Sequence, residues 1–342
     1  MFQSKVKFEI PPFLNAEMPP ERRGIRRDHV KLMVLDRQTG NITHDLFFQL
    51  AHYLSKGDVL VLNSSKTVPA ILKSDVYRAD KKLQKEIEIR LARRINEYSW
   101  EALADFPGLK EGDLLEFSST LQGIVSEIST KGPFIKILFS KQGASLYDEI
   151  YELGEPVRYE YINSPWGLEY YQTVFATQPG SVEMPSAGRA FSWELLFKLK
   201  KKEVQLVFIH LHTGLSYLLD DKWDHSPTEN YEQYSISAEG WETILRAKVD
   251  GRRVIAVGTT VVRAMETVAR NGVLSGWTNL YIKPTSKIQI ANGIVTGMHE
   301  PEASHLDMLS AFIEKDLLSN AYIEALDKGY LWHEFGDMNL II

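Results

Sequence analysis

The sequence predicts an α/β (α+β) fold in which a β-rich insertion interrupts the main domain. From residue 168 onward, strand-like segments alternate with amphipathic helices, which is typical of an α/β layer with mostly parallel strands. Residues 73–156 carry short alternating apolar runs separated by Gly, Pro and Asp, which indicates a small antiparallel β-barrel or sandwich. We therefore expect a discontinuous main domain over 1–72 and 157–342 and an inserted β-rich domain over 73–156.

The first part of the main domain is expected to hold three strands and a short helix. The Pro-rich residues 1–24 are expected to wrap a surface. Two strands joined by a Gly-containing turn at 38–41 follow in "HVKLMVLDRQTGNITHDLF". "FFQLAHYLS" predicts the short helix, and a turn at 56–58 leads into a buried strand over 59–63.

The second part alternates helices and strands. We expect a helix in "SWELLFKLKKKEV" with Ser192 as its N-cap. A strand with almost no polar residue before its end follows in "QLVFIHLHTGL". The remaining predicted elements are a helix in "SAEGWETILRAKVDG", a strand in "RRVIAVG", a helix after Gly258, a strand in "TNLYIKP" and a final stretch "ASHLDMLSAFIEKDLLSNAYIEALDKG".

Composition and charge exclude several functional classes. With 44% hydrophobic residues in 342, the chain has enough apolar positions for a sizeable core. The net charge of −6 excludes a general polyanion binder, so a nucleic-acid partner would need a local basic face. The absence of cysteine excludes disulfides, thiolate metal sites and a Cys nucleophile. Basic clusters occur at 22–27 and 90–94, but acids neighbour both, as on a solvated face.

We expect no targeting or membrane signal in the chain. Its N-terminus has no apolar region of the kind found in signal peptides. We find no run of about 18 apolar residues that would predict a membrane span. We expect a cytoplasmic protein and favour a monomer, although the sequence does not determine the oligomeric state.

The segment "VIAVGTTVVRAMETVARNG" predicts a strand that turns through Gly258 into a helix begun by Thr259 and Thr260. The free N–H groups at such a helix start can hold an anion or a carboxylate, and Arg263 would add a cation nearby. The segment is neither a P-loop nor the three-glycine dinucleotide fingerprint. A second interpretation is that the turn only caps the helix.

Other loops at predicted strand ends carry polar residues, and ligands of α/β sheets bind beyond the carboxyl ends of strands. His210 and His212 end one strand, where a backbone partner for His212 is the alternative to a catalytic role. Further loops are "LNSSKTVPA", "QPGSVEMPSAGRAFS" and "GMHEPEASHL". The last contains the metal-ligand types His299, Glu300, Glu302 and His305. The spacing of its histidines fits no single helix face, so we expect no metal site.

Taken in order, these motifs resemble the S-adenosylmethionine:tRNA ribosyltransferase-isomerase family of queuosine biosynthesis. The resemblance rests on "LMVLDRQTGNITHDLFFQLAHYLSKGDVLVLNSSKTVPAIL", "YQTVFATQPGSVEMPSAGRAFS", "FIHLHTGL", "RRVIAVGTTVVRAMET", "GWTNLYIKP" and "FGDMNLII". It covers nearly the whole chain, with 73–156 matching only loosely. The resemblance implies a barrel-like α/β main domain with an inserted antiparallel β-barrel. It also implies a reaction in which the ribosyl group of S-adenosylmethionine (AdoMet) is transferred onto 7-aminomethyl-7-deazaguanine in tRNA and isomerised, giving epoxyqueuosine.

The resemblance also suggests site residues. AdoMet would be a co-substrate, with no further cofactor and no metal, and tRNA would bind through a local basic face. His212 and His299 are the catalytic candidates, because imidazoles exchange protons near neutral pH. The candidates for AdoMet binding are Gly258, Thr259, Thr260, Arg263 and Tyr171. The candidates for substrate binding are Arg27, Asp28, Asn63, Lys66, Pro185, Ser186 and Gly188.

Several positions depart from the family pattern. The family usually carries His at Ala190, Lys-Ser-Thr at Glu302-Ala303-Ser304, Asp-Thr-Arg at Ser64-Ser65-Lys66 and Arg at Ile71. An alternative is therefore a diverged paralogue that binds another nucleoside-type small molecule. Because a lost acid or base typically costs about 10²–10⁴-fold in rate, we expect this chain to retain little of the tRNA reaction.

Overall fold

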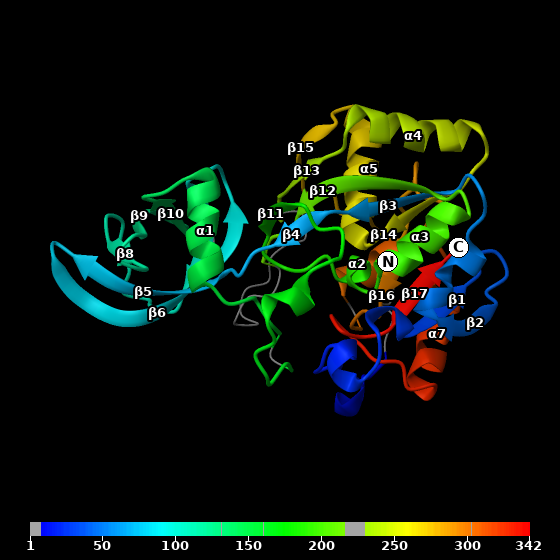
Figure 1. The fold of residues 1–342 in the computed structure, drawn as a ribbon, viewed down its shortest axis with the longest axis horizontal. Helices are drawn as coiled ribbons and strands as arrows, with labels where there is room; N and C mark the ends of the chain where they lie inside the picture. Colours follow the sequence, from blue (N-terminus) through cyan, green and yellow to red (C-terminus); the bar gives the residue numbers. More distant parts are fainter. Residues whose placement is uncertain (1–7, 131, 160, 216–229, 302) are drawn as a thin grey trace.

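The structure, a computed structural model, describes residues 8–130, 132–159, 161–215, 230–301 and 303–342. Figure 1 shows a larger α/β lobe and a smaller β-barrel lobe joined by a narrow crossing. The chain enters the smaller lobe after strand β4 (Ser65–Thr67) and returns to the larger lobe after helix α1 (Gly143–Leu153).

A nine-stranded sheet forms the larger lobe in the described part of the chain. Its order is β15 (Ser275–Thr278), β13 (Glu232–Ser235), β12 (Gln205–His212), β3 (Val59–Asn63), β14 (Val254–Val257), β16 (Gly293–Gly297), β17 (Met338–Ile341), β1 (Lys31–Leu35) and β2 (Ile42–Leu46). The sheet is open, with β15 and β2 at its edges. A separate two-stranded sheet pairs β4 with β11 (Gln178–Ser181) in parallel.

Both faces of the central strands are buried, which explains their apolar runs. Val59 and Val61 of β3 join the hydrophobic cluster that contains α4 and α5, whereas Leu60 and Leu62 join the cluster that contains α3. Figure 1 shows α4 and α5 on one face of the sheet and α3 on the other. The α-helices of this lobe are α2 (Ser186–Arg189), α3 (Trp193–Lys201), α4 (Ala238–Val249), α5 (Thr259–Asn271), α6 (Ser304–Leu309) and α7 (Lys315–Asp327). Short 3-10 helices are η1 (Pro12–Leu14), η2 (Pro20–Arg23), η3 (Arg27–His29), η4 (Phe47–Tyr53) and η5 (Leu168–Tyr171).

The smaller lobe is a closed antiparallel barrel. Its order is β10 (Ile135–Phe139), β7 (Ser99–Ala104), β6 (Lys81–Arg94), β5 (Ile71–Arg78), β8 (Leu114–Glu116) and β9 (Gln122–Ile128). Leu146 and Ile150 of α1 pack into the barrel core. We propose that this lobe is a separate domain; its predicted limits at 73 and 156 stay a prediction, with β5 beginning two residues earlier.

The predicted α/β class with an inserted antiparallel β-barrel is confirmed, but the main domain is not barrel-like, because its nine-stranded sheet is open. The expected turn at 38–41 joins the antiparallel strands β1 and β2. Ser192 caps α3, its hydroxyl accepting a hydrogen bond from Leu195 N at 3.1 Å.

The short helix predicted before β3 is present, as the 3-10 helix η4. Two other local predictions were wrong. The strand expected in "TNLYIKP" lies earlier in the chain, because β15 covers Ser275–Thr278. Strand pairing in the large sheet is evenly mixed, not mostly parallel: among the described strands four pairs are parallel and four antiparallel. The segment expected to be β-rich also contains the helix α1.

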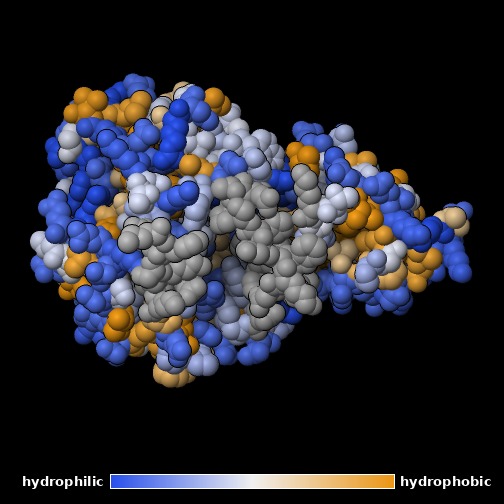
Figure 2. Space-filling view, turned by 180° about the vertical axis from the view of Figure 1, so that it is seen from behind, coloured by the Kyte–Doolittle hydropathy of each residue, from blue (hydrophilic) through white to orange (hydrophobic). Residues whose placement is uncertain are grey.

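Figure 2 shows the opposite face, where hydrophilic groups dominate the larger lobe and apolar groups gather on the smaller lobe near the crossing. None of the helices in the described segments has the length and apolar character needed to cross a bilayer.

Candidate active site

One edge of the large sheet collects most of the predicted site residues. The strands β3, β12, β14 and β16 run parallel, so their carboxyl ends lie at the same edge. Asn63 ends β3, His212 ends β12, and Gly258 follows β14 directly. His299 comes two residues after β16. Ligands of α/β sheets bind at this kind of edge, so these loops form the candidate active site.

The neighbouring strands bring two further segments to the same edge. Strand β17 is antiparallel to β16, with Gly297 paired to Met338, and β1 is parallel to β17, with Leu32 paired to Met338. The residues before β17 and before β1 therefore reach the carboxyl edge of β16. These segments include Glu334 and the predicted residues Arg27 and Asp28.

Gly258 permits the sharp turn from β14 into α5. Its φ of +96° and ψ of 153° lie in a region that glycine alone adopts readily. A β-carbon added there would lie 3.4 Å from the β-carbon of Ala187, so α2 packs close to the turn. Thr259 and Thr260 form the first turn of α5, whose N–H groups have no intrahelical acceptor. This helix start can hold an anionic group.

The guanidinium of Arg263 is engaged by the protein itself. It forms an ion pair with the buried carboxylate of Glu232. Nε donates to Leu280 O at 3.1 Å, and Nη2 donates to Asn230 O at 3.4 Å. Glu232 balances the charge of Arg263. These bonds therefore do not favour a direct contact between Arg263 and AdoMet, which stays a prediction.

His212 lies in a chain of hydroxyl groups. Its Nδ1 is 2.7 Å from Ser65 Oγ, which is 2.6 Å from Ser181 Oγ. Ser181 Oγ also accepts a hydrogen bond from Thr213 N at 3.1 Å. A β-carbon at Gly180 would lie 2.6 Å from His212 Nδ1, so the glycine leaves the space that the imidazole ring occupies. Among the described residues, Nε2 of His212 has no hydrogen-bond partner.

Asn63 fixes the backbone beside His212. Its amide nitrogen donates to Leu211 O at 2.8 Å, and its oxygen accepts from Leu211 N and Ser65 N at 3.0 and 3.1 Å. We call Asn63, Ser65, Ser181 and His212 the paired corner. Burial, with a smaller contribution from the charge of Arg94, lowers the pKa of His212 to about 4. The imidazole is therefore neutral at physiological pH.

His299 lies beyond β16 and is also held by neighbours. Its Nε2 is 2.6 Å from Thr296 Oγ1, and its carbonyl accepts from Trp332 Nε1 at 3.0 Å. The ring stacks on His305 at a centroid distance of 4.5 Å. Burial is the main cause that lowers the pKa of His299 well below its usual range. Within the described segments, no group of three or more His, Cys, Asp or Glu residues could hold a metal ion.

The other predicted binding residues also have partners in the structure. Arg27 donates to Glu21 Oε1 at 3.1 Å and to Gln172 O at 3.3 Å. The carboxylate of Asp28 is buried and accepts hydrogen bonds from Arg26, His29 and Ser192. Lys66 Nζ lies 4.8 Å from the ring centre of Tyr151. Pro185, Ser186 and Gly188 belong to α2 and its N-terminal cap.

A second part of the candidate site carries buried polar groups that lack hydrogen-bond partners. Among the described residues, the hydroxyl of Tyr171 and the Oε2 atom of Glu334 are buried without a hydrogen-bond partner. Burial raises the pKa of both groups, and the carboxylate of Glu183 raises that of Glu334 further. His333, with φ at +72°, precedes Glu334 and stacks on Tyr161 at 4.5 Å. A left-handed conformation is strained for histidine, so the surrounding contacts hold this turn in place.

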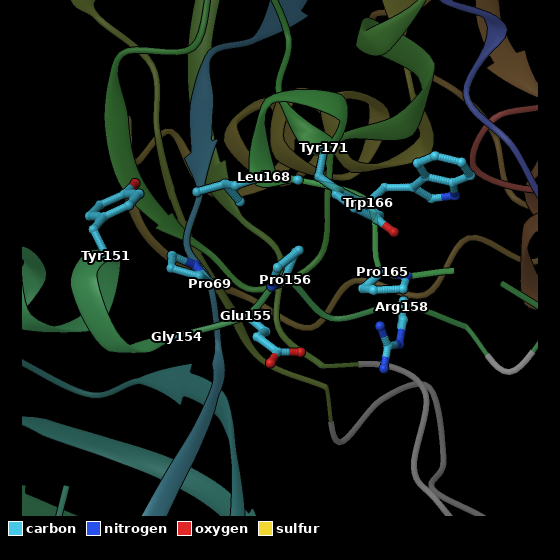
Figure 3. A pocket seen from close by; sticks show the side chains of 11 residues that line it. Pro69, Tyr151, Gly154, Glu155, Pro156, Arg158, Pro165, Trp166, Leu168 and Tyr171 are labelled. Atoms are coloured by element: carbon cyan, nitrogen blue, oxygen red, sulfur yellow. The ribbon is translucent and has the colours of Figure 1, made fainter. Parts of the chain in front are cut away.

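A pocket of about 300 Å³ opens where the two lobes meet, and we call it the hinge pocket. Its walls are Pro69, Tyr151, Gly154, Glu155, Pro156, Arg158, Pro165, Trp166, Gly167, Leu168 and Tyr171. Figure 3 shows rings above and the charged ends of Glu155 and Arg158 below, all around one hollow. Of the predicted site residues, only Tyr171 lines it.

Sequence reasoning identified the loops but missed several residues within them. Ser65 and Ser181 lie in "LNSSKTVPA" and "QPGSVEMPSAGRAFS", but only the fold shows that they meet at His212. Glu334 lies one residue before the motif "FGDMNLII", and nothing in the sequence indicates its burial. Glu155 and Arg158 lie where the resemblance is weak or ends.

Comparison with known proteins decides the family. The sequence profile described as "Queuosine biosynthesis protein" matches residues 3–341. The chain belongs to this family. Its relatives include the S-adenosylmethionine:tRNA ribosyltransferase-isomerases of Carboxydothermus hydrogenoformans, 38% identical, and Clostridioides difficile, 37% identical, each covering 98% of both chains. The crystal structure of S-adenosylmethionine tRNA ribosyltransferase from Thermotoga maritima is 31% identical, with a TM-score of 0.57 over 99% of this chain and 100% of that one.

The structure shows the surroundings of three departures from the queuosine biosynthesis family pattern, at Ala190, Ser64 and Ile71. Ala190 is buried in the apolar cluster beside α3, so a histidine there would bury a polar ring. Ser64 is buried, with its N and Oγ bonded to Ile209 O at 2.8 and 3.0 Å. Ile71 lies at the crossing and exchanges two 2.9 Å backbone hydrogen bonds with Glu155. Glu302 lies outside the described residues.

Proposed function

We propose that this chain is an S-adenosylmethionine:tRNA ribosyltransferase-isomerase. It transfers the ribosyl group of AdoMet onto 7-aminomethyl-7-deazaguanine in tRNA and isomerises it, giving epoxyqueuosine, adenine and methionine. The observation that carries this proposal is the 37–38% identity to relatives of that name over 98% of the chain.

AdoMet has a carboxylate and two ribose hydroxyls, and the start of α5 suits either group. The N–H groups of Thr259 and Thr260 point out of the helix end, and Gly258 lets a ligand approach the backbone closely. Our proposed AdoMet site is formed by Gly258, Thr259 and Thr260, and the partly buried Arg263, bound to Glu232, supports it.

The reaction needs a base, because a proton next to the sulfonium must be removed before carbon–sulfur chemistry can begin. His212 supports this role. When its Nδ1–H donates to Ser65 and Ser65 donates to Ser181, the hydroxyl of Ser181 can reach Leu211 O at 3.5 Å. That direction leaves Nε2 of His212 unprotonated and free of partners in the described structure. The lowered pKa keeps the imidazole neutral at neutral pH.

The test is adenine release from AdoMet in the presence of tRNA that carries 7-aminomethyl-7-deazaguanine. Adenine should appear in step with epoxyqueuosine in the tRNA, and it should not appear with tRNA that carries guanine at the same position. Hydrolysis of AdoMet that is independent of the modified base would contradict the proposal.

The rate is a separate question, because Ala190 and Glu302 depart from the family pattern. We expect turnover below that of a family member with His and Lys at these positions. Ala190→His combined with Glu302→Lys should raise the rate, provided that circular dichroism shows the apolar cluster around position 190 to be intact. Turnover of the unaltered chain equal to that of such a family member would show that both departures are tolerated.

A further inference from the structure

The hinge pocket lies where the chain crosses between the two lobes. Pro69 is on the segment that enters the barrel, and Gly154 to Pro156 are on the segment that leaves it. Ile71 and Glu155 join the two segments through a pair of 2.9 Å backbone hydrogen bonds. A ligand in this pocket would therefore contact both lobes at a fixed point of the crossing.

The walls of the hinge pocket suit a flat ring. Tyr151, Trp166 and Tyr171 contribute aromatic side chains, and Pro156 and Pro165 add rigid apolar surfaces. Heterocycles bind to such surfaces by stacking. A volume of about 300 Å³ is at the lower end of the roughly 300–1,000 Å³ usual for small-molecule sites. The pocket therefore suits one base with part of its sugar better than a complete AdoMet molecule.

Two opposite charges stand on the same side of the hinge pocket. Figure 3 shows the carboxylate of Glu155 and the guanidinium of Arg158 below the rings of Tyr171 and Trp166. Glu155 is exposed and Arg158 is partly exposed, and neither forms an ion pair within the described chain. A ligand that carries both a cation and an anion would satisfy them together.

The hinge pocket is also close to the paired corner. Thr67 accepts hydrogen bonds at its carbonyl from Tyr151 Oη at 3.1 Å and Gln172 Nε2 at 2.7 Å, and its hydroxyl donates to Tyr171 O at 2.8 Å. Ser65, the partner of His212, lies two residues earlier on β4. Two residues of a strand span about 7 Å. A group bound in the pocket can therefore extend towards His212.

We propose that the hinge pocket receives the 7-aminomethyl-7-deazaguanine base of the tRNA, with Glu155 binding its ammonium group and Arg158 binding an adjacent phosphate. This inference rests on the proposed function and assigns a part of its substrate to named residues. Proteins recognise single-stranded RNA loops by stacking splayed bases on aromatic rings and hydrogen-bonding their edges. Glu155 selects the aminomethyl group because a carboxylate pairs with an ammonium and has no such partner in a neutral substituent.

The test uses two RNA stem-loops that differ only in the base, 7-aminomethyl-7-deazaguanine or the uncharged 7-cyano-7-deazaguanine. Glu155→Gln should weaken binding of the aminomethyl RNA about tenfold and leave binding of the cyano RNA unchanged. Arg158→Gln should weaken binding of both RNAs. The matched control is Glu152→Gln, an exposed acid on α1 outside the pocket, which should change neither.

The outcomes separate this assignment from the proposed function. Equal effects of Glu155→Gln on both RNAs, or no effect on either, would overturn the assignment of Glu155 while leaving the reaction intact. A selective loss of AdoMet affinity in the same variant would place the AdoMet ammonium in the pocket and overturn it as well. If the unaltered chain bound neither RNA, the proposed function would fail together with the assignment.

Discussion

The two sides of the candidate active site differ in how their polar groups are satisfied. In the paired corner, His212 and Ser65 bond to each other and Asn63 fixes the backbone of both strands. On the side of the hinge pocket, Tyr171 and Glu334 carry buried polar atoms without partners in the described structure. The paired corner lies at the carboxyl edge of the large sheet, whereas the hinge pocket lies at the crossing between the two lobes.

This difference separates two tasks. A side chain with satisfied hydrogen bonds keeps one orientation, which a proton-transferring group requires. A polar group without a protein partner costs free energy in the folded state and can recover it when a ligand supplies the partner. We infer that the paired corner is preformed for chemistry and that the hinge pocket is completed by its substrate.

Replacement of the base in the paired corner should have the largest effect. His212→Asn should lower the rate of adenine release by about 10²–10⁴-fold, because the variant lacks the proton acceptor. The matched control is His210→Asn two residues earlier on β12, where the ring lies 3.3 Å from Thr177 Oγ1 and the rate should stay close to that of the unaltered chain. Near-normal turnover in His212→Asn would remove this residue from catalysis.

Acid should destabilise the folded chain through His212 of the paired corner. The pKa of His212 is about 4 in the folded chain and about 6.5 in an unfolded one, so between these values the unfolded chain binds more protons. The contribution of His212 to the free energy of unfolding is therefore fully present above pH 6.5. It falls as the pH drops towards 4, by roughly a few kcal/mol at most. Urea unfolding from pH 7 to 4.5 should show a shallower decline in His212→Asn, and equal slopes would contradict the buried neutral imidazole.

Removal of a connecting amide should cost stability in the paired corner. Asn63→Ala removes the hydrogen bond of Leu211 N–H and the shorter of the two bonds to Leu211 O, which keeps only Ser181 Oγ at 3.5 Å in the described structure. We expect a loss of about 1–3 kcal/mol in the free energy of unfolding, measured with urea. A loss below the error of the measurement would mean that the corner is not held in the way the geometry indicates.

The smallest effect is expected for the unpaired hydroxyl near the hinge pocket. Tyr171→Phe removes an oxygen that bonds to no described residue, so the free energy of unfolding should change by less than about 1 kcal/mol or rise. Binding of the aminomethyl RNA should nevertheless weaken in this variant. A large loss of stability with unchanged RNA binding would contradict the proposal that Tyr171 contributes to base binding in the hinge pocket.

Local patterns in the sequence predicted many of the strands, helices and turns. Gly258 between a β-branched strand and an amphipathic helix predicted the turn, and Ser192 before a helical pattern predicted a cap that the structure contains. The partner of Arg263 could not be predicted, because Glu232 lies 31 residues away and only the sheet brings it close. The hinge pocket was missed because its walls come from the crossing between the lobes, where no periodic pattern exists.

The measurement that tests this division most directly is adenine-release kinetics as a function of tRNA concentration for the unaltered chain, His212→Asn and Glu155→Gln. The account predicts that His212→Asn lowers kcat with little change in KM for tRNA, and that Glu155→Gln raises this KM with little change in kcat. The opposite pattern, with KM altered by His212→Asn and kcat by Glu155→Gln, would contradict the assignment of chemistry to the paired corner and of base binding to the hinge pocket.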